Sequence, residues 1–230
     1  MATSGVSSFD LNLNALVEEA FERGGAELRT GYDLRTARRS LNLLFADWAN
    51  RGVNLWTIEQ GEIALLPGQA TYALPADTVD LLDHVVRQFD GTVNQTDITI
   101  SRIAEPTYAT IPNKLTRGRP IQVWIQRTST PQIHVWPTSD GPAGTYTFVY
   151  WRLRRMQDAG AGGTFTQDVP FRFLPCLVAG LASALSLKLP GVDPIRIQML
   201  KADYEEQWQR AAEEDRDKAP LRFVPHLTMY

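Results

Sequence analysis

Residues 31–57, GYDLRTARRSLNLLFADWANRGVNLWT, decide how the N-terminal part of the chain folds. Thr30 and Asp33 have the spacing of a helix capping box, and Gly52 can end a helix in the left-handed conformation. Between them, apolar side chains recur every three or four residues, as on one face of an α-helix. The members of this stripe are Leu34, Ala37, Leu41, Leu44, Phe45 and Trp48. The stretch therefore predicts a helix whose stripe must be buried against other elements.

Three arginines of this helix, Arg35, Arg38 and Arg39, lie mostly off the apolar stripe. A guanidinium binds a carboxylate through two parallel hydrogen bonds, so arginine suits ion pairs between packed surfaces. We expect these arginines, and a second basic cluster of Arg152, Arg154 and Arg155, to pair with the acidic C-terminal helix, within one subunit or between neighbouring copies. A nucleic-acid-binding surface is the alternative, and its affinity for DNA would fall steeply with salt.

Three further helices are predicted by the same periodicity. The first covers Leu13–Phe21 and ends at Gly24-Gly25. The second runs from Cys176 to Leu189 and is apolar nearly all round, which indicates a helix enclosed by other helices. The third begins at Asp193-Pro194, an N-cap followed by proline, and Glu206 and Arg210 form an i,i+4 ion pair on it.

Between these helical parts, the period of the pattern changes from 3.6 to 2. Alternating segments predict six to eight short antiparallel strands between about residues 55 and 155. Leu66–Gln69 has proline and glycine at the positions that a type II turn requires, and Glu105–Ile111 fits a single helical turn. On the strand 121–125, Ile121, Val123 and Ile125 share one face. These features are typical of a sandwich or a small barrel.

The order of helices, strands and helices predicts an α+β fold, a discontinuous helical bundle with an inserted antiparallel β-sandwich or barrel-like domain. The economical arrangement buries all the helices in one bundle that is split in sequence. The expected domains are residues 10–54 with 165–218 for the helical core, 55–157 for the β-domain and 219–230 for an extended C-terminal tail.

The composition limits the class of protein. The chain has 230 residues, a formal net charge of −3 and one cysteine, so it has no broadly basic character and no internal disulfide. We expect no signal peptide, because the N-terminus lacks a basic segment followed by an apolar one, and no membrane span. Synthesis in a cytoplasm follows from these expectations.

Nothing in the sequence has the pattern of an active site. Three scattered histidines, His84, His134 and His226, and Cys176 do not have the spacing of a zinc site. The glycine-rich segment 160–164 lacks the Lys-Ser/Thr of a phosphate-binding loop and is interpreted as a linker. We therefore expect no enzyme activity, no metal and no cofactor.

Two other features suggest contact surfaces. Trp124 and Trp136 lie on predicted strands, and aromatic side chains exposed on a sheet can bind protein or sugar, although burial in the core is the simpler expectation for each one. The last residues are apolar and belong to no predicted element, so they are expected to dock on the chain's own surface or in a partner's groove. They are Leu221, Arg222, Phe223, Val224, Pro225, His226, Leu227, Met229 and Tyr230.

Three segments together resemble the head-to-tail connector (adaptor) proteins of short-tailed bacteriophages. They are the arginine-rich helix that ends in Trp-Ala-Asn-Arg-Gly at 48–52, LPGQATYALPADTVDLL at 66–82, and the region from YWRLRRMQD at 150–158 through the long final helix. The resemblance covers about Leu13–Arg222. None of these segments is a catalytic signature, and the specificity lies in their order.

The resemblance implies a structural function in the virion neck. Such proteins form rings, typically of twelve subunits, between the capsid portal and the tail, and the ring encloses the DNA channel. It implies as partners the portal protein, neighbouring copies and a tail or nozzle protein. The C-terminal tail residues 221–230 would bind the portal, and Trp124 and Trp136 the tail protein. The expected inter-subunit residues are Arg35, Arg38, Arg39, Glu205, Glu206 and Glu213. A carbohydrate- or protein-binding β-domain of a tail component is the alternative function.

Overall fold

A computed structural model describes residues 5–6, 8–28, 31–52, 55–89, 94–161 and 164–216. The chain divides into two compact units, residues 1–55 with 157–230 and residues 56–156. The first unit is helical and the second is built from strands, which confirms the mixed α+β class. The expected cap at Thr30 and the tail 221–230 lie outside the described residues.

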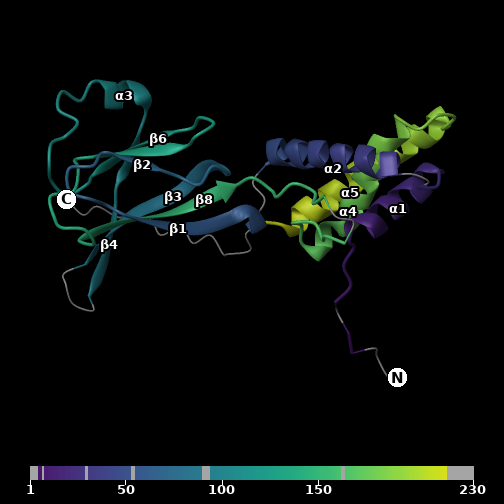
Figure 1. Cartoon of the computed structure of the whole chain (residues 1–230), viewed down its shortest axis with the longest axis horizontal. Coiled ribbons are helices and arrows are strands. Elements are labelled where there is room, and N and C mark those ends of the chain that lie inside the picture. Colours follow the sequence, from purple (N-terminus) through teal and green to yellow (C-terminus); the bar gives the residue numbers. More distant parts are fainter. Residues whose placement is uncertain are drawn as a thin grey trace, which may run out of the picture. The chain divides into compact units, whose positions relative to one another are not determined.

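Four helices form the helical unit (Figure 1). They are α1 (Leu13–Gly24), α2 (Gly31–Arg51), α4 (Leu174–Ser186) and α5 (Pro194–Glu214), with the short 3-10 turn η2 (Phe171–Phe173) before α4. A second 3-10 turn, η1 (Leu55–Thr57), lies where the first unit ends and the second begins. Figure 1 shows α1 and α2, in purple and blue, beside α4 and α5, in green and yellow, although the whole strand region separates them in sequence.

Local side chains set the ends of these helices. The Asn12 side chain accepts a hydrogen bond from the Ala15 amide at 2.9 Å, so it satisfies an orphan donor of α1. Gly25 follows α1 with φ 81°, the left-handed conformation that glycine adopts without strain. At α5, the Asp193 carboxylate accepts from the Ile195 amide at 2.9 Å, as its N-cap position predicts.

The apolar helix α4 lies at the centre of the helical unit and contacts α1, α2 and α5. Its side chains are buried on nearly every side, as its lack of a polar face predicts. Gly180 lets α4 approach α2 and α5 closely, since a Cβ there would lie 2.9 Å from both Leu44 Cδ2 and Tyr204 Cε2. Trp48 of α2 is fully buried and donates a hydrogen bond from Nε1 to the Tyr204 hydroxyl at 2.9 Å.

The second unit contains two four-stranded sheets and the short helix α3 (Glu105–Ala109) (Figure 1). One sheet has the order β1-β8-β3-β4, and the other has the order β2-β7-β6-β5. The strands are β1 (Ile58–Ala64), β2 (Thr71–Ala73), β3 (Thr78–Phe89), β4 (Gln95–Thr99), β5 (Ser101–Ile103), β6 (Gln122–Gln126), β7 (Gln132–Trp136) and β8 (Tyr146–Arg154).

The predicted turn at Leu66–Gln69 is confirmed, but the strands on either side of it do not pair with each other. The Gln69 amide donates to the Leu66 carbonyl at 3.2 Å, and Gly68 has φ 74°. The turn carries the chain from β1 in one sheet to β2 in the other. The Tyr72 hydroxyl accepts a hydrogen bond from the Leu66 amide at 2.8 Å, so Tyr72 of β2 stabilises the turn between the two sheets.

Buried side chains from both sheets form one core in this unit. Val86 and Phe148 come from the first sheet, and Val123 and Ile133 from the second. Among the described strands the sheets do not close into a barrel, and β5 and β6 pair in parallel, against the expectation of antiparallel pairing throughout. Val123 and Ile125 share a buried face as expected, but Ile121 is exposed because β6 begins only at Gln122.

Candidate functional site

The basic residues of α2 are available for contacts outside the chain. Arg35 and Arg39 are exposed and Arg38 is half-exposed. Within the described part of the chain, none of the three makes an ion pair or a side-chain hydrogen bond. They lie off the buried stripe as the sequence predicts, and their charge is not neutralised by a described neighbour.

Two apolar side chains lie on the same outer face of α2. At 100° per residue, positions 32, 35, 39 and 43 fall within one narrow sector of the helix. Tyr32 and Leu43 are both exposed, so they flank Arg35 and Arg39 along that sector. We call Tyr32, Arg35, Arg39 and Leu43 the α2 face. Large exposed apolar residues beside unpaired charges are typical of interface residues.

The acidic helix α5 carries a second outer face. Ile195, Met199, Glu206 and Glu213 all lie within one sector of α5 and are exposed. We call these four residues the α5 face. Glu206 accepts a hydrogen bond from Arg210, the i,i+4 pair that the sequence predicts. Glu213 makes no ion pair among the residues that the structure describes.

Glu205, which we expected at a subunit contact, is bound within the chain. Its carboxylate accepts from Arg51 Nη1 at 2.9 Å and from Nη2 at 3.0 Å. The hydrogen bond from Arg51 lowers the pKa of Glu205, and the same bond is the largest cause of the raised pKa of Arg51. This pair joins the end of α2 to α5, but it is made by Arg51 and not by the arginines for which the sequence predicts such a pairing.

Sequence reasoning did not single out Arg51, although it lies in the last turn of α2. Asp47, four residues earlier, contacts Arg51 Nε at 2.8 Å, and that spacing is a visible signal for an ion pair. The Arg51 guanidinium also lies 4.9 Å from the centre of the Tyr204 ring and 5.2 Å from that of Trp208. Packing across 150 residues of sequence places those rings there, so periodicity alone could not have identified the contact.

The other basic cluster is used inside the β-unit. Arg152 bonds to Asp77 at 2.5 Å and to Glu59 at 2.8 Å, and Arg154 bonds to Glu59 at 2.7 Å. The hydrogen bond from Arg152 lowers the pKa of Asp77. These arginines therefore pair with acids of the neighbouring strand and loop, and not with the acidic C-terminal helix as expected.

The two tryptophans named for tail-protein contacts are half-buried. Trp124 stacks on His134 with 4.5 Å between ring centroids, and Tyr108 of α3 lies 5.1 Å from Trp124. Trp136 donates from Nε1 to the Asn113 carbonyl at 3.0 Å. Their partners are other groups of the same β-unit.

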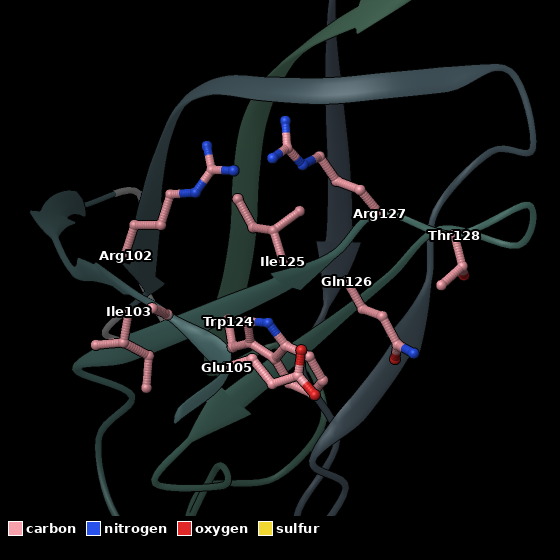
Figure 2. Close-up of a pocket in the computed structure, with 9 residues that line it drawn as sticks. Arg102, Ile103, Glu105, Trp124, Ile125, Gln126, Arg127 and Thr128 are labelled. Carbon is pink, nitrogen blue, oxygen red and sulfur yellow. The ribbon is translucent and has the colours of Figure 1, made fainter. Parts of the chain in front are cut away.

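An open groove of about 530 Å³ lies beside Trp124 (Figure 2). Its walls come from the segment 102–105 and from the end of β6 through Thr128. Figure 2 shows the guanidinium groups of Arg102 and Arg127 pointing toward each other across the groove. Both bind the carboxylate of Asp80, at 2.9 Å and 3.1 Å, so they form a polar rim held by one shared acid.

The described residues offer no catalytic constellation. They contain no group of three histidine, cysteine or acidic side chains that could hold a metal ion. Burial lowers the pKa of both His84 and His134 and raises the pKa of the Cys176 thiol to about 12, so that thiol is not a nucleophile at neutral pH. No described helix has the length and hydropathy to cross a membrane.

Comparison with known proteins agrees with the resemblance of this sequence to phage adaptor proteins. A sequence model of the SU10 adaptor protein family matches residues 12–224, which include nearly all of both units. No curated protein matches the chain significantly. The family consists of structural adaptors of bacteriophages. The chain therefore belongs to the SU10 adaptor protein family.

Proposed function

We propose that copies of this adaptor form a closed ring, with twelve as the expected number, that joins the capsid portal to the tail and encloses the DNA channel. A closed ring repeats one head-to-tail contact, so each subunit must present two different surfaces that fit each other. The observation that supports this proposal is the pair of outer faces on α2 and α5.

The two faces are complementary in both charge and polarity. The α2 face has two unpaired arginines between Tyr32 and Leu43, and the α5 face has exposed Ile195 and Met199 followed by Glu206 and Glu213. In the proposed ring, the α2 face of one copy contacts the α5 face of the next. Arg38 lies beside the α2 face. Glu205 lies next to Glu206 of the α5 face and binds Arg51 of its own chain. Repetition around the ring multiplies a modest contact.

The C-terminal segment Leu221–Tyr230 is proposed to bind the portal. Its apolar residues follow the end of α5 and provide side chains suited to a hydrophobic groove on a partner. On the β-unit, the groove beside Trp124 is the proposed contact for the tail or nozzle protein. The open polar rim of Arg102 and Arg127 supports a protein ligand over the carbohydrate alternative, and the Trp124 ring is already stacked on His134.

Charge reversal tests the ring contact. Arg35→Glu with Arg39→Glu on one face, or Glu206→Lys with Glu213→Lys on the other, should each abolish ring formation because like charges then meet. The variant with all four changes restores opposite charges and should recover rings in electron micrographs. Lys201→Glu, on another side of α5, is the control and should leave the rings intact. Rings in all variants would refute this contact.

The same purified variants test the nucleic-acid alternative. Passage of the genome favours weak contacts with DNA, so we expect low affinity and a shallow salt dependence. Binding that falls steeply with salt and disappears in the Arg35→Glu, Arg39→Glu variant would instead assign the α2 face to DNA.

A further inference from the structure

The helical unit has an apolar groove of about 820 Å³ that none of the contacts described above uses. Phe9 and Leu11 of the N-terminal segment form one wall, and the start of α4 with η2 forms the other. The Glu19–Arg23 ion pair of α1, at 2.9 Å, lies at its edge. The complete lining is Phe9, Leu11, Glu19, Arg23, Phe171, Leu174, Pro175 and Val178.

The groove exposes large aromatic side chains. Phe9 is 74% exposed and Phe171 is 77% exposed, while Leu174 and Val178 form a buried floor between them. Contiguous apolar surface of this kind on a folded protein usually marks a place where another segment binds. The groove therefore requires an occupant with apolar side chains and little secondary structure of its own.

The end of the described chain lies close to this groove. Asp215, the residue after α5, is buried and accepts hydrogen bonds from the Leu55 amide, at 2.9 Å, and from Arg172 Nη2. Arg172 is the sequence neighbour of Phe171 in η2. The bond from Arg172 therefore ties the end of α5 to the residue next to Phe171 of the groove wall, and the chain continues from Arg216.

The remaining residues, 217–230, have the length and composition to fill the groove. An extended chain covers about 3.3 Å per residue, so this segment can reach about 45 Å. It contains Leu221, Phe223, Val224, Leu227, Met229 and Tyr230, and two prolines disfavour helix. A tethered segment acts at an effective concentration on the order of mM, so even weak affinity suffices to keep it bound.

We propose that Leu221–Tyr230 occupies this groove of its own chain before assembly. Docking in the groove and binding to the portal use the same apolar residues, so the two states exclude each other. The unassembled subunit thereby keeps its portal-binding residues covered, and the portal competes for them. The docking concerns the chain without a partner and does not depend on ring formation, whereas the competition with the portal rests on the proposed portal binding of this segment.

Disulfide trapping in the full chain tests this docking. Phe171→Cys combined with Phe223→Cys places thiols on the groove wall and in the segment. Leu187→Cys combined with Phe223→Cys is the matched control, since Leu187 is also exposed and apolar but lies beyond the other end of α4. Phe171 and Leu187 are exposed and are not part of the described core, and the native Cys176 is buried.

Oxidation of the monomeric fraction, followed over time, gives the readout. We expect an intrachain disulfide at least tenfold faster for the 171/223 pair than for the 187/223 pair, and slower when free peptide of residues 221–230 is added. Mass spectrometry of the cross-linked peptides identifies the bond. Equal rates for the two pairs, or no effect of the peptide, would overturn the proposal. A disulfide that joins two chains would assign the groove to a second copy instead. Since no portal is present, failure here leaves the ring proposal standing.

Discussion

At the scale of single residues, the hydrogen bond between Trp48 and Tyr204 is a buried polar contact between α2 and α5. Trp48 is fully buried, so its Nε1–H has no access to water if the hydroxyl is removed. Tyr204→Phe should lower the free energy of unfolding by about 1–3 kcal/mol, the cost of a buried unsatisfied donor. Chemical denaturation measures this change.

Tyr32→Phe is the matched control, because the Tyr32 side chain is exposed on the outer side of the same helix α2. Removing this solvated hydroxyl should change the free energy of unfolding by less than about 0.5 kcal/mol. Equal effects of the two substitutions would show that the Trp48–Tyr204 bond contributes nothing beyond packing.

His84 gives the stability of the β-unit a pH dependence. Its ring stacks on Phe148 at 5.7 Å, and burial lowers its pKa in the folded state. A lowered folded-state pKa means that the unfolded chain binds more protons, so stability is complete above the unfolded-state pKa of about 6.5 and declines as the pH falls below it. His84→Leu should remove part of this decline between pH 7 and pH 5. An unchanged pH profile of unfolding would contradict it.

At the scale of elements, the close approach of α4 to its neighbours depends on Gly180. In an exposed helix, replacing glycine by alanine stabilises by about 0.5–1 kcal/mol. Here the added Cβ would meet Leu44 and the rigid ring of Tyr204 at 2.9 Å, and such overpacking costs about 1–3 kcal/mol. Gly180→Ala should therefore lower the melting temperature. Ser183→Ala on the same helix is the control and should leave it nearly unchanged.

The sequence predicts individual elements better than their partners. Local signals suffice for Asp193 as a cap, for the enclosed helix α4 and for the turn at Leu66–Gln69, since each depends on residues close in the chain. The pairing of β1 with β8 does not follow from such local signals, because the two strands are nearly 90 residues apart in the sequence and become neighbours only when the sheet forms. For the same reason, alternation could not separate a sandwich from a barrel or predict the parallel β5–β6 pair.

The same limit applies to the candidate contact residues. Helical spacing correctly leaves Arg35, Arg38 and Arg39 off the buried stripe. It cannot tell which acid of α5 is already bound, because the Arg51–Glu205 bond depends on how two distant helices pack. It also gives no sign of the apolar groove, whose two walls come from the N-terminal segment and from α4.

At the scale of the whole molecule, different parts of the chain are proposed to contact different partners. The helical unit is proposed to contact copies of itself through the α2 and α5 faces, and the β-unit is proposed to bind a tail protein at its polar groove. The segment 221–230 is proposed to change partner, from its own groove to the portal. Each assignment uses shape and charge on the surface, and none requires a chemical reaction.

The mass of the purified chain, measured alone and after mixing with its portal by native mass spectrometry or mass photometry, tests the central proposal most directly. We predict a closed species of fixed subunit number, twelve on the family's example, at least when the portal is present. A chain that stays monomeric under both conditions, with or without the portal, would contradict the account.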